Sequence, residues 1–453
     1  EDLDVPPTLV SFAAAVGKVA HVTSPELKAA GHDVILVHPR YEADGITPAA
    51  TPLIDALSLV ERLIRSGEAL AVSTPGYGCL AETLFKMCVG NQLGLNIHGA
   101  LHEDALFEPA YGSFVVELAE GASIPRSKEG GCSVMALGTT TAAYVLALDG
   151  QTLELAPLQE AWEARMEPVF PYRRAGEEVE QLSFDVRDRG GRRRPTPKVK
   201  LARPRVVIPV FSGNNCEYDS ARAFRAAGAE VTTLVINNLS PQAVAASTRA
   251  LADEIGRSQI VMIPGGFSGG DEPDGAAKFI TAFFRAPTVS EAVRKLLQDR
   301  DGLMLGICNG FQALVKLGLV PYGDIVPMTD ECATLTFNAI GRHQSRLVNT
   351  RIASNLSPWF SACELGDIHS IAISHGEGRF VAPRPLLERL KDTGQIATQY
   401  VDASGQPSLD LSVNPNGSML AIEGITSPDG RILGKMGHSE RSTKGTFKNV
   451  CGR

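Results

Sequence analysis

The chain has 453 residues, of which 44% are hydrophobic and 21% are charged, and its formal net charge is −8. This length is more than one ordinary domain needs, so we expect two or three domains, each with its own core. The acidic balance argues against a broad attraction to nucleic acid or to an anionic membrane. No apolar run approaches the ~18–20 residues that a membrane-spanning helix requires. We therefore expect neither nucleic acid nor membrane among the partners.

The eight cysteines are scattered along the chain and form no C-x-x-C pair. Such usage argues against a disulfide scaffold and against a zinc ribbon, and it favours a reducing compartment. The N-terminal stretch EDLDVPPTLV is acidic and has no apolar signal-peptide core. We therefore predict a cytoplasmic protein without metal ligands, and we expect the chain to be a piece of a longer protein.

Residues 1–175 mix strand-like and helix-like segments, which predicts an α+β domain. The stretch GHDVILVH reads as a strand, and PLIDALSLVERLIRSG carries leucine and isoleucine at helical spacing. Residues 176–203 have an acidic start, a basic end, prolines and few large apolar residues, which is typical of a linker. The run GGRRRP in this segment would suit an RNA contact. It has no interleaved aromatic residues, so a solvated linker is the preferred interpretation.

Residues 204–453 alternate buried strands with helices, as in RVVIPVF, EYDSARAFRAAG and EVTTLVI. This rhythm predicts an α/β domain with a doubly wound, mostly parallel sheet covered on both faces. Ligands in such sheets bind beyond the carboxyl ends of the strands. Two glycine-rich turns, PGGFSGG and GICNG, lie at such ends.

Cys308 lies between Gly306 and Gly310, directly after the apolar run GLMLGI and before a helical pattern. A residue between small neighbours at a strand-to-helix turn is typical of a nucleophile elbow. The N-terminus of the following helix favours the thiolate form. The alternative is a buried structural cysteine beside a tight turn, and from this motif alone the two interpretations have similar weight.

A cysteine nucleophile needs a base, and the base needs an acid that orients it. Two pairs qualify, His375 with Glu377 and His438 with Glu440, because residues two apart in an extended segment point the same way. Taken alone, each histidine is more often a satisfied core or surface residue than a catalytic base. The loop PGGFSGGDEPDG can direct backbone N–H groups at an oxyanion, and it lacks the G-K-[ST] ending of a phosphate loop.

Five motifs in this order resemble a class I (Cys-His-Glu) glutamine amidotransferase: VFSGNNCEYDSARAF, PGGFSGGD, GICNGFQ, NPNGS and GHSER. More narrowly, they are similar to the glutaminase end of the single-chain phosphoribosylformylglycinamidine synthase family. The resemblance covers about residues 204–453 and implies a flavodoxin-like fold and glutamine as substrate. It implies Cys308 as nucleophile, His438 as base and Glu440 as the residue that orients it. The family's H-P-E-R motif has Ser439 here in place of proline.

The same resemblance implies that Gly266 and Asn309 offer backbone N–H groups to the oxyanion. It also implies a set of glutamine-binding or near-site residues: Gln312, Gly265, Phe267, His375 and Glu377.

The first domain resembles, more loosely, the C-terminal module of the aminoimidazole ribonucleotide synthetase type. Its stretch STPGYGCL lacks the carboxylates of the corresponding family pattern, so no metal ligand is expected there. Full-length synthases of this family use ATP and Mg²⁺ to amidinate formylglycinamide ribonucleotide. The resemblance therefore implies that this chain holds no cofactor and that the N-terminal portion of the same synthase is its partner.

Two other functions stay open from the residues alone. One is a different Cys-His-Glu hydrolase on the same scaffold, such as a γ-glutamyl hydrolase or a relative of cysteine peptidases. The other is a non-catalytic docking fragment.

Overall fold

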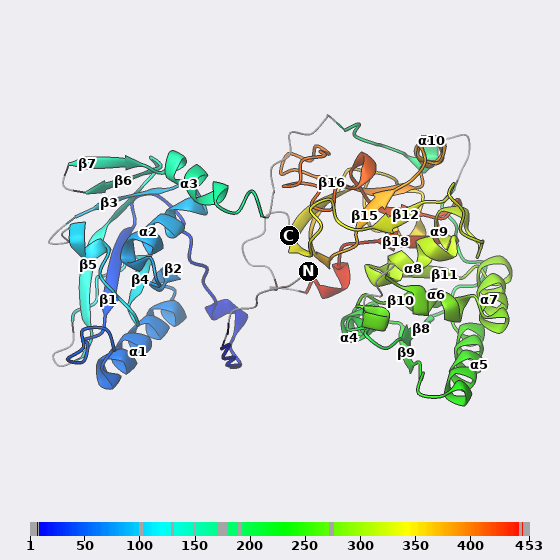
Figure 1. Cartoon of the computed structure of the whole chain (residues 1–453), viewed down its shortest axis with the longest axis horizontal. Helices are drawn as coiled ribbons and strands as arrows, with labels where there is room; N and C mark the ends of the chain where they lie inside the picture. The colour runs from blue at the N-terminus through cyan, green and yellow to red at the C-terminus, as the bar shows by residue number, and fades with distance from the viewer. Residues whose placement is uncertain are drawn as a thin grey trace. The chain divides into compact units, whose positions relative to one another are not determined.

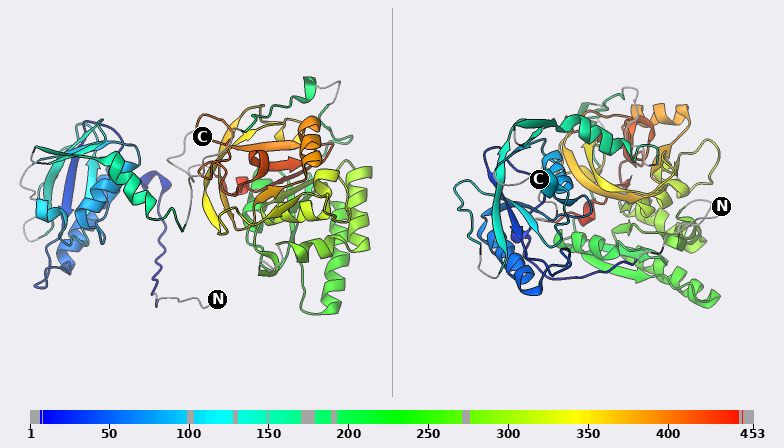
Figure 2. Two further views of the ribbon diagram at one scale, coloured as in Figure 1. Left: turned by 45° about the horizontal axis from the view of Figure 1, so that its top comes forward. Right: turned by 60° about the vertical axis from the view of Figure 1, so that its left-hand side comes forward.

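The computed structural model describes the chain except for residues 1–6, 8, 99–102, 128–130, 149, 170–178, 189–192, 271–275, 444, 445 and 447–453. Two compact units are present, Glu1–Met166 and Glu167–Arg453. They can be followed by colour in Figures 1 and 2, blue to teal for unit 1 and green to red for unit 2. Within the described residues, no helix is long and apolar enough to cross a membrane.

Unit 1 is built on a seven-stranded sheet in the order β2-β4-β1-β5-β3-β6-β7. Its neighbouring strands are antiparallel except for the parallel pair β3 and β6. The strands are β1 (Asp33–His38), β2 (Ala69–Ser73), β3 (Gly94–Ile97), β4 (Phe114–Leu118), β5 (Ser133–Thr141), β6 (Val145–Leu148) and β7 (Gln151–Glu154). The helices are α1 (Ala50–Ser66), α2 (Cys79–Val89) and α3 (Leu155–Ala164).

Strand β1 shows why this sheet has helices on both faces. Val34 and Leu36 belong to a core that contains side chains of α2. Ile35 and Val37 belong to a second core, which contains side chains of α1. Because successive side chains of a strand point to opposite faces, an apolar residue is needed at each of the four positions. The continuous run VILV in the sequence is the result.

Unit 2 is built on a nine-stranded sheet in the order β14-β13-β16-β17-β18-β11-β10-β8-β9. The block from β9 to β18 is parallel, and the pairs from β18 to β14 are antiparallel. The strands are β8 (Arg205–Val210), β9 (Glu230–Val235), β10 (Ile260–Ile263), β11 (Leu303–Ile307), β13 (Gln344–Ile352), β14 (Ile368–His375), β16 (Ile396–Val401), β17 (Ile422–Thr426) and β18 (Ile432–Lys435). The predicted α/β class is confirmed, and the sheet is mixed because its second half is antiparallel.

The helices of unit 2 cover the parallel half of this sheet and enclose the largest core. Leu251 and Ile255 of α5 and Phe311 and Leu314 of α8 share one buried cluster with the parallel strands. The helices are α4 (Glu217–Ala226), α5 (Pro241–Arg257), α6 (Lys278–Phe284), α7 (Pro287–Arg294), α8 (Asn309–Leu317), α9 (Leu319–Tyr322) and α10 (Arg384–Thr393). A separate two-stranded sheet pairs β12 (Thr334–Thr336) with β15 (Arg379–Val381).

Part of the expected linker, residues 176–203, is packed on unit 2. The Phe184 side chain is 4% exposed and clusters with Val186 and Leu356. The Phe184 N–H donates to the Ala353 carbonyl at 2.9 Å, and the Arg351 guanidinium donates to the Leu182 carbonyl at 2.6 Å. The segment looked too polar to be buried because few of its side chains are large and apolar. Those at alternate positions 182, 184 and 186 pack on the cores of unit 2.

Replacing Phe184 with alanine is expected to destabilise unit 2 by about 3–5 kcal/mol, the usual cost of removing a buried aromatic side chain. Denaturant unfolding followed by the fluorescence of Trp359, in a Trp162→Phe background, measures this unit alone. Val199→Ala is the matched control, because that side chain is 70% exposed in the same segment, and it should change stability by less than about 0.5 kcal/mol. Equal stability of the two variants would contradict the packing of this segment.

Candidate functional site

The candidate site forms where four neighbouring parallel strands end. Strands β18, β11, β10 and β8 are adjacent in the sheet and run parallel, so their carboxyl ends lie at one edge. The loops after β18 and β11 carry His438 and Cys308, and the loops after β10 and β8 carry Gly265 and Cys216. Residues far apart in the sequence are brought together in this way.

Cys308 occupies a sharp turn between β11 and α8, with φ 53° and ψ −108°. Its neighbours explain why glycines flank it. A Cβ on Gly310 would lie 2.0 Å from the Ile263 carbonyl oxygen, and a Cβ on Gly306 would lie 2.6 Å from the Gly310 carbonyl oxygen. The Cys308 N–H donates to the Lys435 carbonyl at 2.9 Å. A non-glycine residue seldom adopts a positive φ, and here the surrounding contacts hold Cys308 in it. Such a strained turn is typical of functional sites.

The Cys308 thiol is buried, and it is 5% exposed. Its Sγ donates to the Ser374 carbonyl oxygen at 3.7 Å. Burial, followed by the nearby Cys216 sulfur, raises the pKa of Cys308 to about 12, although the Asn309 N–H lowers it. The start of helix α8 thus favours the thiolate as expected, but loss of water outweighs this effect and keeps the thiol protonated.

His438 is bound to Glu440, and both side chains are buried. The distance from His438 Nδ1 to Glu440 Oε1 is 2.6 Å, and the side chains are 2% and 4% exposed. The His438 N–H anchors the loop by donating to the Ala372 carbonyl of β14 at 2.8 Å. A Cβ on Gly265 would lie 2.7 Å from His438 Cε1 and 3.4 Å from Cys308 Cβ. The absence of a side chain at Gly265 thus lets the imidazole and the cysteine approach the same point.

The second pair, His375 and Glu377, has different partners. His375 Nδ1 lies 3.2 Å from Asn338 Oδ1, and Glu377 Oε2 accepts the Ala276 N–H at 3.0 Å. Burial, with the nearby His438 as the next cause, lowers the pKa of His375 to about 3. Its ring is therefore neutral at physiological pH, and the glutamate two residues away does not orient it.

Asn309 and Gln312 tie the glycine loop and the segment after β14 to helix α8. Asn309 Nδ2 donates to Gln312 Oε1 at 2.9 Å, and Asn309 Oδ1 accepts the Ser268 N–H at 3.3 Å. Gln312 Nε2 donates to the Glu377 carbonyl at 2.6 Å. The predicted near-site residues thus include a connected, buried hydrogen-bond network.

The glycine loop after β10 is described as far as residue 270, and its continuation, residues 271–275, lies outside the described residues. Gly266 has φ 143°, and a Cβ there would lie 2.5 Å from Asn214 Cα. Phe267 is 36% exposed, and its N–H donates to the Gly213 carbonyl at 2.8 Å. The backbone at Asn214 therefore lies too close to position 266 for any residue other than glycine.

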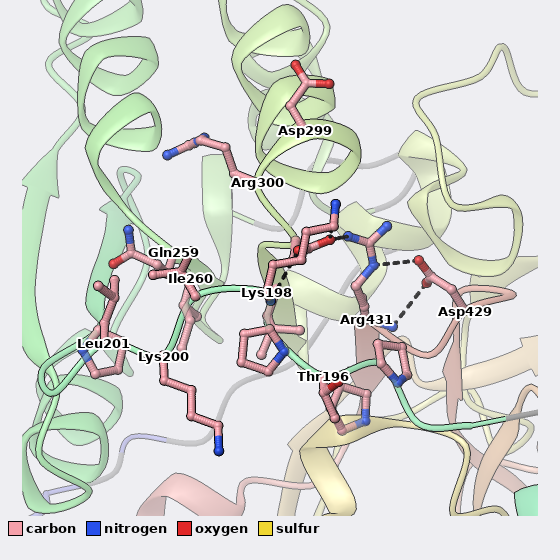
Figure 3. Close-up of a pocket in the computed structure, with 17 residues that line it drawn as sticks. Thr196, Lys198, Lys200, Leu201, Gln259, Ile260, Asp299, Arg300, Asp429 and Arg431 are labelled. Carbon is pink, nitrogen blue, oxygen red and sulfur yellow. Dashed lines mark hydrogen bonds and ion pairs between the residues drawn. The ribbon is translucent and has the colours of Figure 1, made fainter.

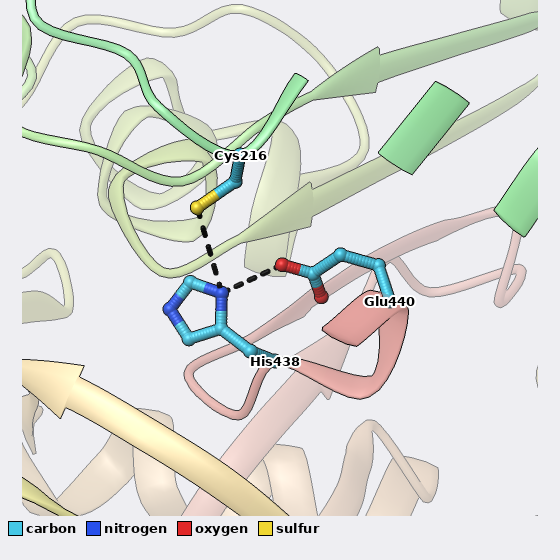
Figure 4. A group of neighbouring side chains, drawn as sticks. All are labelled: Cys216, His438 and Glu440. Carbon is cyan, nitrogen blue, oxygen red and sulfur yellow. Dashed lines mark hydrogen bonds and ion pairs between the residues drawn. The ribbon is translucent and has the colours of Figure 1, made fainter. Parts of the chain in front are cut away.

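Cys216 belongs to the site although the sequence did not point to it as a functional residue. Its Sγ lies 3.8 Å from His438 Nδ1 and accepts a hydrogen bond from Arg441 at 2.9 Å. Figure 4 shows Cys216, His438 and Glu440 facing one another from two loops. The available signal was its position in NNCEYD directly after a strand of the parallel block.

A cavity of about 1120 Å³ lies elsewhere in unit 2, as shown in Figure 3. Gln259 and Leu303 line it, so it adjoins the amino ends of β10 and β11, opposite to Cys308. Its charged lining includes both signs, with Arg431 paired to Asp429 at 2.6 Å. We therefore do not assign this cavity to the chemistry of the Cys308 thiol.

Residues 203–453 match the family described as CobB/CobQ-like glutamine amidotransferase domain. Phosphoribosylformylglycinamidine synthase subunit PurQ of Methanococcus maripaludis is 33% identical over 243 residues, covering 53% of this chain and 82% of the relative. The subunit of the same name from Chlorobium chlorochromatii is 34% identical over 252 residues, covering 55% of this chain and 92% of the relative.

Among solved structures, PurLQS from Thermotoga maritima is 23% identical with a TM-score of 0.39, covering 54% of this chain and 93% of that one. The family match spans more than half of the chain, and two relatives above 30% identity are covered over most of their length. The chain therefore belongs to the CobB/CobQ-like glutamine amidotransferase domain family.

Proposed function

We propose that this chain is the glutaminase part of a phosphoribosylformylglycinamidine synthase, with Cys308 as nucleophile, His438 as base and Glu440 as the residue that orients the base. The observation that carries the proposal is the meeting of a buried cysteine turn and a bound His438–Glu440 pair at one sheet edge. The PurQ subunits to which residues 203–453 are related support the same reaction. They do not favour a γ-glutamyl hydrolase or a docking fragment.

The reaction begins with a proton transfer, because the thiol is protonated in its buried setting. Cys308 Sγ gives its proton to His438 and attacks the side-chain amide carbon of glutamine. Backbone N–H groups of Gly266 and Asn309 stabilise the oxyanion, which is the usual role of such donors. His438 protonates the leaving ammonia and then activates a water, which releases glutamate from the thioester. Glu440 stays bound to Nδ1 and stabilises the imidazolium.

The remaining predicted residues would hold the substrate. Gly265 lies beside Cys308, and Phe267 follows it in the same loop. The thiol donates to Ser374 of β14, the strand that ends at His375, and Gln312 donates to the carbonyl of Glu377 two residues further on. ATP, Mg²⁺ and formylglycinamide ribonucleotide would be used by the whole synthase, with the N-terminal portion of the same enzyme as partner. Ammonia would be the product that this chain delivers to it.

Glu423 positions the loop that carries His438. It is fully buried, and its Oε1 accepts the Gly437 N–H at 2.7 Å while Oε2 accepts the Thr398 hydroxyl. Lys435 Nζ lies 4.0 Å from the same carboxylate. A Cβ on Gly437 would lie 2.0 Å from Ile371 Cδ1, so the loop is also fixed by packing.

Labelling with the glutamine-like electrophile diazo-oxonorleucine, followed by peptide mass spectrometry, should modify Cys308 first. Cys308→Ala should abolish both labelling and glutamine hydrolysis while leaving the unfolding transition unchanged. Cys332 is the matched control thiol: burial raises its pKa, but hydrogen bonds with Thr329 outweigh this and lower it overall. Cys332→Ser should therefore behave as wild type, and preferential labelling of Cys332 or Cys216 would overturn the assignment.

Because His438 and His375 have different hydrogen-bond partners, their replacement should affect glutamine turnover differently. His438→Ala should lower glutamine turnover by about 10²–10⁴, the usual contribution of a general acid–base group. His375→Ala should leave measurable turnover, because His375 is bound to Asn338 and not to a carboxylate. Steady-state ammonia release by the two variants measures this, and the reverse order of losses would make His375 the base.

Glu423→Gln should lower kcat about 10- to 100-fold with little change in KM, since a base displaced by about 1 Å loses that much rate. The amide keeps the volume but offers a weaker acceptor to Gly437 and no charge to Lys435. Glu388→Gln, an exposed carboxylate on α10, is the control and should leave both constants unchanged. A pure KM effect in Glu423→Gln would place Glu423 at the substrate and not behind the base.

Glutamine hydrolysis by this chain is expected to depend on the rest of the synthase. This chain alone should hydrolyse glutamine slowly and should not form the amidine from ATP and the ribonucleotide. Adding the N-terminal portion in trans should raise glutamine hydrolysis, more so with ribonucleotide and an ATP analogue bound, because domain contacts complete the site. Coupled assays of ammonia and amidine formation measure both. Amidine formation by residues 1–453 alone would contradict this division of labour.

A further inference from the structure

Cys216 is a second buried thiol at the site, and the proposed mechanism does not use it. It is fully buried and begins helix α4 as the residue directly before Glu217. Its sulfur faces the same imidazole nitrogen, His438 Nδ1, that Glu440 holds. Three different donor atoms, a sulfur, a nitrogen and an oxygen, therefore converge on one point from two loops.

These donor atoms all lie within 4.8 Å of one another. The Sγ–Nδ1 distance is 3.8 Å and the Nδ1–Oε1 distance is 2.6 Å. Tetrahedral Zn²⁺ with its ordinary bond lengths would set these separations at roughly 3.5 Å and roughly 3.4 Å. Small side-chain rotations, of less than about 1 Å at each atom, convert the present arrangement into a three-ligand site with an open fourth position.

A second observation points to a ligand at this place. Glu440 Oε2 is buried, and among the described residues it has no hydrogen-bond partner. A buried carboxylate oxygen without a partner is unusual because its desolvation is uncompensated. Burial raises the pKa of Cys216, and the Arg441 guanidinium, which donates to its sulfur at 2.9 Å, opposes that shift only in part, so a metal would bind with loss of the thiol proton to solvent.

We propose that Cys216, His438 and Glu440 form a binding site for a borderline-soft divalent cation of the Zn²⁺ class. The thiolate and imidazole donors select Zn²⁺ or Co²⁺ over Mg²⁺, which prefers oxygen ligands. Occupation places the metal on Nδ1, so the ring proton moves to Nε2 and the imidazole no longer accepts the proton of Cys308. The cation thus inhibits hydrolysis without binding the nucleophile. Only this inhibition rests on the proposed function, whereas the binding stands apart from it.

The test uses the 453-residue chain and Co²⁺ as a spectroscopic probe. Wild type should bind one Co²⁺ with a thiolate-to-cobalt charge-transfer band, and excess Mg²⁺ should not displace it. Cys216→Ser should lose the band and bind Co²⁺ at least about tenfold more weakly. Cys308→Ala should keep the band. Cys363→Ser should also keep it, and this variant controls for the other Cys–Asp–His group, Cys363, Asp367 and His369.

The outcomes separate the alternatives. A band that survives in Cys216→Ser, that is lost in Cys308→Ala, or that never forms overturns the proposal. Should Cys216→Ser fail to fold, X-ray absorption on zinc-loaded Cys308→Ala decides instead, with one Zn–S contact near about 2.3 Å expected and none contradicting the site. Zn²⁺ should also block the labelling of Cys308 in wild type, and removal of the zinc with a chelator should restore this labelling. Wild type that forms the cobalt band but hydrolyses no glutamine even after the metal has been removed by chelation would refute the proposed function and leave the metal site standing.

Discussion

The site depends on one close contact, the approach of Gly310 to the carbonyl of Ile263. A side chain at position 310 would lie 2.0 Å from that oxygen, so helix α8 can pack this tightly against β10 only without one. The contact fixes where α8 begins, and with it the left-handed turn at Cys308. Because β10, β11 and β18 are adjacent and parallel, fixing this turn also fixes how far the cysteine stands from Gly265 and His438.

The same tight packing controls the chemistry of the thiol. Excluding water from Cys308 raises its pKa, so the resting group is a protonated thiol that donates to the Ser374 carbonyl. In the proposed mechanism, the thiolate forms only when a proton can pass to His438, whose Nδ1 is held by Glu440. In a protein whose product is ammonia, a thiol that is inert until substrate and base are aligned avoids wasteful turnover. Burial of the Cys308 thiol therefore limits its reactivity to the moment at which substrate is bound.

Local patterns in the sequence were sufficient for the α/β class and for a tight turn at Cys308, because the alternation of strands and helices indicates a parallel sheet and both interpretations of the G-x-C-x-G spacing place the cysteine at such a turn. They were not sufficient to choose between His375 and His438 without the family resemblance. That choice depends on which carboxylate each ring meets, and Asn338, which binds His375, lies 37 residues away. The antiparallel half of the sheet, the packing of Phe184 and the position of Cys216 were missed for the same reason, since all three depend on contacts between distant segments.

The loop around His438 is held by contacts with distant segments and not by residues that restrict its own backbone. Gly437 precedes the histidine and Ser439 follows it where the related motif has proline, so the backbone itself restrains the loop weakly. Restraint comes instead from Glu423 of β17, which accepts the Gly437 N–H, and from Ala372 of β14, which accepts the His438 N–H. Both strands belong to the antiparallel half of the sheet. The parallel half thus presents Cys308, the proposed nucleophile, the antiparallel half holds His438, the proposed base, and β18 is the strand at which the two halves meet.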